Sequence, residues 1–471
     1  MGETYFVDNM VEFRVTSTCS TTGADTIDTI AGSGTIAAGD PLRLDVGGST
    51  WRIFRFVTDL GGGEWQLDRN HGISYPSSSV PIKYGIYDGT AQEPSGDAGP
   101  FPTIARALAA ADGDDVINIK KNNGYKLDNV DQIVEPLWPT GSGDVALNIK
   151  LRVRGFNATP GDMDPGGAYC QSPLDAYLSG IDSDCIVDID GNGSAFSIME
   201  IDAKDNIEFS NLYFHNTDKA TGHQCIEVLN QSNGLLFDRC FFDDAYRAIA
   251  GTGVELAPVD GTLVRDCYGG STWTKPGTHI KLTGVLNFVV RSVWNGCGSA
   301  VAGSGGFFGN LAVGGVNVFT GNGSVYIKNN TVYNCTGGAI FLHYNNAVAV
   351  VCDNILVPNQ SGYAIKINTG GGSVRNNYNC IWGSDGNQLA TPFITFKSGG
   401  TAPVLGDHSI EADPKFVNPA SGDFRARNKS VLRGGQPDTM GNATQMGAIL
   451  QRYQFAQRGR MANFARLGII R

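Results

Sequence analysis

Three stretches of this sequence decide its fold: IKNNTVY at residues 327–333, VCDNILV at 351–357 and VRNNYNC at 374–380. Each opens on a β-branched residue, continues with polar residues and returns to an apolar one, and the openings are 24 and 23 residues apart. Earlier in the chain the same phrase recurs at steps of 28, 27, 26 and 37 residues. Such a period predicts stacked supersecondary units that bury their apolar sides only against one another. The openings are Phe209, Phe237, Val264, Val290, Ile327, Val351 and Val374.

Short runs between the openings show strand character. Residues 225–228, 279–282, 339–342 and 364–367 alternate with period two and are rich in β-branched residues. This pattern favours strands over helices. We therefore predict an all-β stack in which every coil carries two or three short strands.

The fourth position of the last three phrases forms a column of asparagines. Stacked one coil apart, such side chains can hydrogen-bond to each other and to the turn backbone, which would satisfy buried polar groups. The same position in three earlier coils holds small or aliphatic residues, which are alternative fillers of such a column. The predicted ladder is Asn330, Asn354 and Asn377, and the earlier fillers are Leu212, Cys240 and Cys267.

Residues 87–450 resemble a right-handed parallel β-helix of the pectin-lyase-like superfamily. The opening GPFPTI at 99–104, followed by ARALAAA at 105–111 and GDDVI at 113–117, resembles the capping helix and first strand of that family. The stretches DPKFVNP at 413–419 and MGAI at 446–449 resemble its closing segment. The resemblance implies that both ends of the stack are covered, since an open end would invite edge-to-edge association.

Two segments break the coil pattern. Residues 1–86 contain alternating stretches at 11–15 and 51–57 separated by glycine-rich turns, and we interpret them as a small all-β domain. Residues 451–471 form an arginine-rich arm without acidic residues, so the arm carries +5 and the rest of the chain −16. Docking onto a partner and folding back on the acidic body are both open for the arm. Its candidate docking residues are Arg452, Arg458, Arg460, Arg466 and Arg471.

Composition narrows the cellular context. The first residues lack a basic segment followed by an apolar stretch, so we expect no secretory signal peptide, and no apolar run is long enough for a membrane span. The ten cysteines fall mostly in predicted strands and turn columns, and we expect reduced core fillers. The acidic body disfavours nucleic-acid binding, because it would repel phosphate. We expect no metal and no cofactor, since the DIDGNG pattern at 188–193 lacks the distal ligands of a calcium loop.

Candidate catalytic carboxylates cluster in the middle of the chain. A glycosidase needs two carboxylates at a suitable separation, one acting as acid and the other as base or nucleophile. The densest acidic group supplies candidates, although a solvated acidic turn on an acidic protein explains the same residues. The candidates are Glu227, Asp238, Asp243 and Asp244.

The predicted function follows from the fold resemblance and the two termini. We expect a virion surface protein, a phage capsid-decorating spike or tailspike, that projects its β-helix toward host or environmental glycans. The domain 1–86 or the arm would dock onto a capsid or tail protein, and the resemblance to tailspikes implies a homotrimer. The alternative is a polysaccharide lyase or glycoside hydrolase with an acidic site on the helix face. A cell-surface adhesin is disfavoured, because the sequence shows neither an export signal nor an anchor.

Overall fold

The structure is a computed structural model of the 471-residue chain. It describes most of the chain up to residue 448. The described residues are 2–8, 15–28, 41–47, 51–84, 89–93, 99–122, 125–126, 137–145, 147, 149–194, 196–218, 223–251, 259–270, 278–282, 286–296, 299–302, 305–321, 324–342, 348–367, 373–389, 394–396, 405–435 and 444–448.

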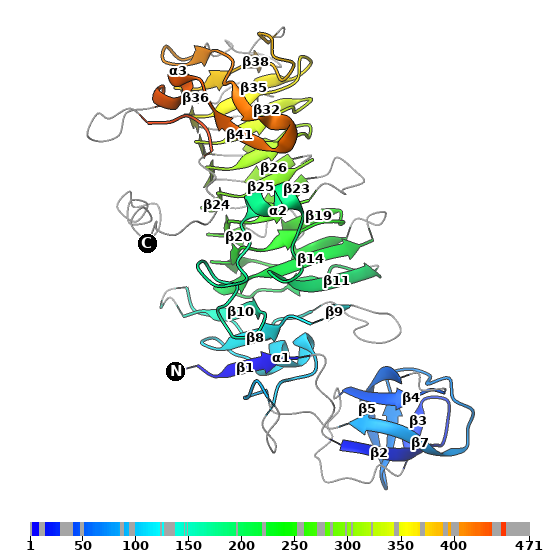
Figure 1. Ribbon diagram of the computed structural model, residues 1–471. Helices are drawn as coiled ribbons and strands as arrows, with labels where there is room; N and C mark the ends of the chain where they lie inside the picture. The colour runs from blue at the N-terminus through cyan, green and yellow to red at the C-terminus, as the bar shows by residue number, and fades with distance from the viewer. Residues whose placement is uncertain are drawn as a thin grey trace.

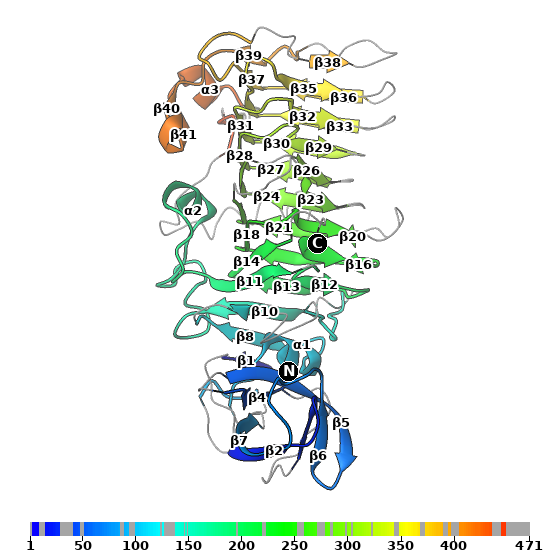
Figure 2. The same cartoon turned by 90° about the vertical axis from the view of Figure 1, so that its right-hand side faces the viewer.

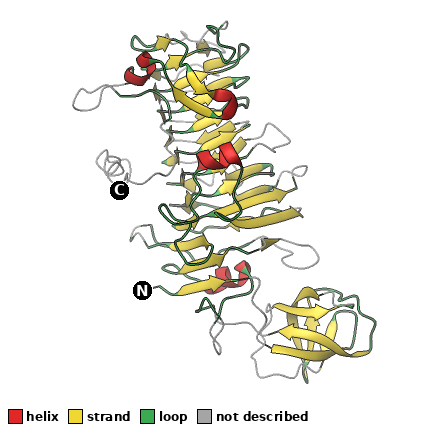
Figure 3. Ribbon diagram, in the orientation of Figure 1, coloured by secondary structure: helices red, strands yellow, loops and turns green. Residues whose placement is uncertain are grey.

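Three long parallel sheets run side by side along the body of the molecule (Figures 1 and 3). Over most of its length the chain visits the first, second and third sheet in turn, so each coil contributes one strand to each. In the described residues the first sheet has 11 strands. They are β1 (Thr4–Val7), β8 (Val116–Lys120), β10 (Leu151–Phe156), β13 (Ile207–Ser210), β17 (Leu236–Asp238), β21 (Leu263–Arg265), β24 (Asn287–Val290), β27 (Gly305–Phe308), β30 (Val325–Lys328), β33 (Val348–Cys352) and β36 (Ser373–Asn377).

The second and third sheets complete each coil. The second sheet consists of β9 (Tyr125–Lys126), β11 (Val187–Ser194), β14 (Leu212–Thr217), β18 (Phe241–Phe242), β22 (Tyr268–Gly269), β25 (Val293–Asn295), β28 (Leu311–Val313), β31 (Thr331–Tyr333), β34 (Ile355–Val357), β37 (Cys380–Ile381) and β39 (Ile410–Glu411). The third sheet consists of β12 (Met199–Ile201), β15 (Gln224–Val228), β19 (Arg247–Gly251), β23 (Thr278–Leu282), β26 (Ser299–Ala302), β29 (Phe319–Gly321), β32 (Gly338–Leu342), β35 (Tyr363–Ile367) and β38 (Ile394–Phe396). Between the third and first sheets, β16 (Ser232–Asn233) pairs with β20 (Val259–Asp260). The predicted all-β stacked fold is confirmed.

The register corrects two of the predicted openings, because Val289 takes the place of Val290 and Asn376 that of Val374. Val264 pairs with Val289 and not with Val290. The apparent step of 37 residues hides a whole coil, because Phe307 lies between Val289 and Ile327. The short coil escaped the pattern because its β27 strand begins with two glycines.

The asparagine ladder exists, with one correction. Asn310, Asn330, Asn354 and Asn379 occupy successive coils, and the amide Nδ2 of each of the first three donates to the Oδ1 of the next at 2.9, 3.1 and 3.0 Å. All four side chains are fully buried. Asn377 is not a member, because Val351 pairs with Asn376 and this shifts the ladder position to Asn379. The ladder satisfies turn groups that would otherwise be buried unpaired.

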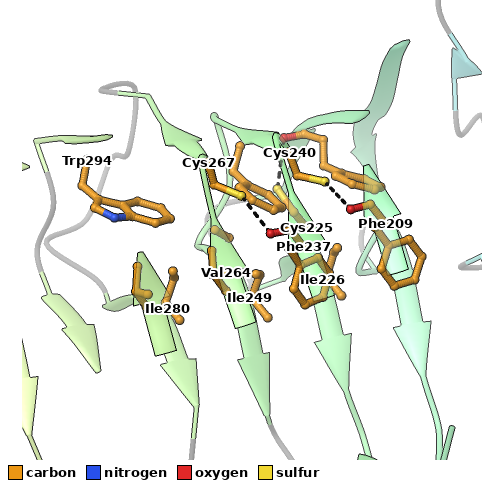
Figure 4. Packing of buried hydrophobic residues seen from close by; sticks show 14 of the residues in the cluster. Phe209, Cys225, Ile226, Phe237, Cys240, Ile249, Val264, Cys267, Ile280 and Trp294 are labelled. Atoms are coloured by element: carbon orange, nitrogen blue, oxygen red, sulfur yellow. Dashed lines mark hydrogen bonds between the residues drawn. The ribbon is translucent and has the colours of Figure 1, made fainter. Parts of the chain in front are cut away.

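The earlier coils fill the same column with thiols (Figure 4). Cys240 Sγ lies 3.5 Å from the carbonyl oxygen of Phe209, and Cys267 Sγ lies 3.5 Å from that of Phe237. Burial raises the pKa of Cys240 to about 12, so this side chain is an uncharged core filler. The rings of Phe209 and Phe237 stack beside it with centroids 5.3 Å apart. The nine described cysteines are all free thiols, which agrees with the expected reduced state.

The two ends of the stack differ from the family expectation in one respect. The predicted capping helix is present as α1 (Ile104–Ala110), N-capped by Thr103, and its Leu108 lies in the buried core. The closing segment instead packs along the outward face of the second sheet, where Val431 and Met446 join Ile355 in a separate cluster. Its elements are β40 (Phe416–Asn418), η1 (Pro419–Ser421), β41 (Asp423–Ala426) and α3 (Lys429–Arg433). A fourth short helix, α2 (Pro173–Ser179), covers the same face nearer the middle.

The small β domain is a closed barrel with its own core. Residues 1–86 are not a contiguous domain, because β1 is the first strand of the first sheet and pairs with β8. The barrel is therefore inserted between β1 and α1, and it lies at the N-terminal end of the stack (Figures 1 and 2). Its strands are β2 (Val15–Thr21), β3 (Thr26–Asp28), β4 (Pro41–Asp45), β5 (Trp51–Gly61), β6 (Glu64–Leu67) and β7 (Ser77–Tyr84).

Two further predictions from the sequence concern the C-terminal arm and membrane-spanning segments. The arm at 451–471, with its five candidate docking arginines, lies outside the described residues. Among the helices that are described, none is long and apolar enough to cross a membrane.

Candidate active site

Two glutamates stand opposite each other on the outward face of the third sheet. Glu200 of β12 pairs in register with Glu227 of β15, one coil further along. Their neighbours Met199, Ile201 and Ile226 are buried in the core. Because side chains alternate between the two faces of a strand, both carboxyl groups must point outward. The two glutamates thus share one face at the spacing of adjacent strands.

Burial and neighbouring charge favour the protonated form of Glu200. Burial, and then the negative charges of Glu227 and Asp202, raise the pKa of Glu200 from 4.5 to about 7. Glu227 has a hydrogen-bond donor of its own, since Ser197 Oγ donates to Glu227 Oε2 at 2.6 Å. At neutral pH Glu200 therefore holds its proton for much of the time, beside a second carboxyl group. This is the pattern in which one carboxyl group acts as acid and its neighbour as nucleophile or base.

An exposed tryptophan occupies the preceding coil. Leu137 forms a parallel bridge with Met199 and donates its backbone N–H to the carbonyl of Ile198 at 2.9 Å. Trp138 follows at the position that precedes Glu200 in the outward column, and it is 39% exposed. Aromatic rings with one wet face are suited to stacking on sugar rings. The column therefore reads Trp138, Glu200 and Glu227 over three successive coils.

Two buried polar atoms near this column have no hydrogen-bond partner among the described residues. Gln224 pairs with Arg247 in the register of β15 and β19. Within the described residues, neither Gln224 Oε1 nor Arg247 Nε has a hydrogen-bond partner, although both atoms are buried. The Arg247 guanidinium lies over the Tyr246 ring, 4.9 Å from its centroid. Unsatisfied buried polar atoms are costly in a native structure, so their presence beside a carboxylate pair suggests groups reserved for a ligand.

The spacing of the pair fits one class of chemistry. Adjacent strands lie about 4.8 Å apart. Retaining glycosidases hold their two carboxyl groups about 5–5.5 Å apart, whereas inverting enzymes need roughly 6.5–9.5 Å to admit a water. The backbone spacing of the two in-register glutamates is therefore closer to the shorter separation.

Asp238, a predicted catalytic residue, lies elsewhere and is already paired. It ends β17 in the first sheet and is 2% exposed. Arg265 Nε and Nη2 donate to its two carboxylate oxygens at 2.8 and 3.0 Å, and Arg239 forms a second ion pair with it. A buried carboxylate held by two guanidinium groups is fixed in place. The geometry gives Asp238 a structural role.

Asp243 and Asp244 lie at the end of β18, where the chain leaves the second sheet. The backbone N–H of Asp244 donates to Asp243 Oδ1 at 2.9 Å, and Asp244 has a left-handed backbone with φ of 50°. The carbonyl of Asp244 accepts from the N–H of Thr217 on the preceding coil. The pair therefore shapes a turn that is repeated from coil to coil.

The four predicted carboxylates do not converge. Asp238 belongs to the first sheet, Asp243 and Asp244 follow the second, and only Glu227 lies on the third. The partner that sequence reasoning missed is Glu200, although a signal was present: it precedes Glu227 by 27 residues, the length of one coil. Trp138 carried no such signal, because it precedes the regular coils.

The acidic pattern at 188–193 forms strand rather than a calcium loop. Asp188 lies in β11, and its Oδ1 is 2.6 Å from His215 Nε2 of β14. Asp190 Oδ1 accepts from the N–H of Asn192 and from Asn216 Nδ2, both at 2.7 Å. No group of three or more potential metal-ligating side chains is found in the described part of the chain.

Comparison with known proteins places the fold. Residues 196–379 match the family model described as right handed beta helix region. No curated protein sequence matches the chain significantly. A solved pectate lyase structure is similar, with 13% identity and a TM-score of 0.43 over 77% of this chain and 93% of that chain. The catalytic unit of a thermostable alpha-1,3-glucanase from Streptomyces thermodiastaticus has 11% identity and a TM-score of 0.37 over 84% and 94% of the two chains.

A third similar structure is the tailspike protein of a Pseudomonas phage. It has 12% identity and a TM-score of 0.18, and the match covers 79% of this chain and 58% of that chain. Residues 196–379 match a right-handed β-helix region, and the stacked coils of three parallel strands show that the body of this chain is a parallel β-helix.

Proposed function

We propose that the protein cleaves glycosidic bonds in a polysaccharide, with Glu200 and Glu227 as the catalytic pair. The observation that carries this proposal is the register of the two glutamates on neighbouring coils, next to Trp138 in the same outward column. The raised pKa of Glu200 supports it, because a general acid must hold a proton near neutral pH. An elongated, open sheet face also suits a chain-like substrate.

The proposed mechanism assigns one role to each group. Glu200 donates its proton to the glycosidic oxygen as the bond from the anomeric carbon to that oxygen breaks. Glu227 attacks the anomeric carbon and forms a glycosyl ester, held in place by the hydrogen bond from Ser197. Glu200, now ionised, then takes a proton from water, whose oxygen displaces Glu227 and restores both carboxyl groups. Trp138 stacks on a neighbouring sugar ring and fixes the chain in register.

A variant series tests this proposal. The full chain and the variants Glu200→Gln, Glu227→Gln and Glu208→Gln are incubated with a panel of capsular and exopolysaccharides, and new reducing ends are measured. Glu208 is the matched control, because it lies on the first sheet and pairs with Lys150 at 3.4 Å. We expect losses of about 10³-fold or more for the two site variants and none for the control. Equal activity in all four proteins would overturn the assignment, and an unsaturated product would indicate a lyase instead.

We further propose that this helix is displayed on a virion surface as a homotrimeric spike. The observation favouring this location is the inserted barrel, which has its own buried core separate from that of the helix. Such a unit can attach to a capsid or tail protein without disturbing the coils.

Particle binding tests this second proposal. Purified full chain, and a chain lacking the barrel at residues 15–84, are incubated with candidate virus particles, and co-sedimentation is measured together with mass by light scattering. We expect a trimer that sediments with particles only when the barrel is present. A monomer, or sedimentation with particles that persists without the barrel, would contradict the spike interpretation.

A further inference from the structure

An apolar strip runs along the outward face of the first sheet. It crosses five successive coils, from β21 to β33. Two of its six side chains are well exposed, Tyr326 by 54% and Val348 by 45%, and the other four are half-buried. The Phe288 and Phe308 rings contact each other with centroids 6.0 Å apart. The strip consists of Leu263, Phe288, Phe308, Tyr326, Val348 and Val350.

The outward faces of the second and third sheets carry no such exposed apolar strip in the described residues. The second sheet buries its outward residues under α2 and the closing segment, where Tyr177 and Phe424 pack against Tyr268 and Val293. The third sheet carries Glu200 and Glu227. None of the six strip residues belongs to a buried cluster formed by the described residues. A contiguous apolar strip of this kind on a soluble chain marks an interaction surface.

The described chain ends beside this strip. Asn329 Nδ2, at the end of β30, donates to the carbonyl of Gln445 at 3.1 Å, and the N–H of Gly447 donates to the carbonyl of Asp353. Ala448 is held by Thr331 Oγ1 at 2.9 Å. Tyr326 precedes Asn329 by three residues, about 10 Å along an extended strand. Gln445 therefore lies at the corner that follows β30, and Ala448, the last described residue, is anchored at the start of β31 in the second sheet, one corner away from the strip.

We propose that the C-terminal segment 449–471, which consists of the arm at 451–471 and the two residues before it, docks onto the apolar strip of its own chain. The segment has the required length, since 23 extended residues reach up to about 75 Å whereas the strip spans only about 19 Å over four coil steps. It also has the required composition, because it holds two aromatic residues near its start and a third, with three aliphatic residues, near its end. These are Tyr453, Phe455, Phe464, Leu467, Ile469 and Ile470.

Charge does not drive this docking. The arm's arginines could be attracted only by acidic residues, and those next to the strip already have basic partners. Asp238 pairs with Arg265, Asp266 with Arg291 and Asp353 with Lys328. The five arginines of the arm then remain in water, and the contact rests on apolar burial. Docking should therefore withstand high salt, whereas an arginine-driven contact would weaken. If the arm docks on its own chain, the barrel is the element that attaches to a partner. The docking of the arm does not depend on the proposed glycan-cleaving activity.

Photocrosslinking in the full chain tests the proposal. A benzoylphenylalanine is placed at Tyr326, and in a control protein at Leu60, which is 49% exposed on the barrel. After illumination the products are sized and the crosslinked peptides are mapped by mass spectrometry. We expect crosslinks from position 326 to peptides of 449–471 within one chain, at least about tenfold above the control and unchanged in high salt. Crosslinks between two chains would assign the strip to a second copy, and crosslinks to no arm peptide would equally overturn the proposal.

A second measurement uses the arm's own arginines. Trypsin cleaves a docked arm only when it opens, so the cutting rate follows the open population. Replacing Tyr326 by Asp should accelerate removal of the arm roughly tenfold, since it places a charge under the docked segment. The control Leu60→Asp should leave the rate unchanged. Equal rates in wild type and Tyr326→Asp would contradict docking at the strip even if both proteins fold normally.

Discussion

The asparagine ladder offers the sharpest test of how the coils are held together. Asn330 occupies its centre, and its side chain takes part in four buried hydrogen bonds to neighbouring coils, besides a part-buried one to the Lys328 carbonyl. Its Oδ1 accepts from the backbone N–H and from Nδ2 of Asn310, both at 2.9 Å. Its Nδ2 donates to the Phe307 carbonyl at 2.9 Å and to Asn354 Oδ1 at 3.1 Å. Replacing Asn330 by Ala removes all four.

The expected cost follows from that count. A typical buried hydrogen bond contributes about 1 kcal/mol net, so the variant should lose about 4 kcal/mol of local stability. Asn377→Ala is the matched control, because Asn377 lies outside the ladder and its bonds to Tyr378 and His408 are accessible to water. We expect the control to lose no more than about 1 kcal/mol.

Hydrogen exchange resolves the effect locally, which matters because a stack of coils does not unfold as one unit. Peptides covering 305–333 are followed by mass spectrometry in wild type, Asn330→Ala and Asn377→Ala. At 1.4 kcal/mol per tenfold change, a loss of about 4 kcal/mol predicts exchange faster by about three orders of magnitude in Asn330→Ala. Protection within tenfold of wild type, or a larger loss in Asn377→Ala, would refute the reasoning.

Three further predictions concern the candidate site and its surroundings. The raised pKa of Glu200 means that the folded protein keeps this proton between pH 4.5 and about 7 while the unfolded chain releases it, so stability falls as the pH rises through that window. Discounted for partial exposure, Glu200→Gln should stabilise the chain by about 1 kcal/mol at pH 8 and not at pH 4, as measured by urea unfolding. Asp238→Asn should lower stability by about 3 kcal/mol in the same assay yet leave the cleavage rate per folded molecule unchanged, because it breaks a buried ion pair outside the site; a selective loss of cleavage would restore Asp238 as a catalytic candidate. Trp138→Ala should raise KM about tenfold with little change in kcat, and steady-state kinetics that show the reverse would place Trp138 outside the substrate path.

The repeat period was enough to predict the architecture, because each coil must place apolar residues at the same inward positions. Phe209, Phe237 and Val264 follow that rule and are in register. The rule failed where glycines replace apolar residues. The strand through Phe307 begins with Gly305 and Gly306, so its coil was not recognised in the sequence. A one-residue slip then gave Val290 in place of Val289.

The inserted barrel could not be predicted from local patterns. The strand Thr4–Val7 has only four residues, and its partner Val116–Lys120 lies more than a hundred residues away. Nothing in so short a strand specifies pairing over that distance. The predicted domain 1–86 therefore ends correctly, just after the last barrel strand. It begins too early, because Thr4–Val7 belongs to the first sheet and not to the barrel.

Of the candidate site, Glu227 was found from the sequence but Glu200 was missed, because the prediction looked for carboxylates that are close along the chain. Sequence clustering drew attention to Asp238, Asp243 and Asp244, which are close along the chain but turn onto different faces within a single coil. Sites on a stacked helix are instead assembled from residues one period apart, as Glu200 and Glu227 are. Period, rather than proximity in sequence, is the useful guide to function in this fold.

The most direct test of the central claim is the titration of Glu200 itself. Carbon NMR of the full chain, labelled at the glutamate side-chain carboxyl carbons, follows each glutamate with pH and needs no substrate. We predict one resonance that titrates near pH 7, disappears in Glu200→Gln and moves toward 4.5 in Glu227→Gln, because removing the neighbouring charge relieves part of the shift. A protein in which every glutamate titrates near 4.5 would contradict the account.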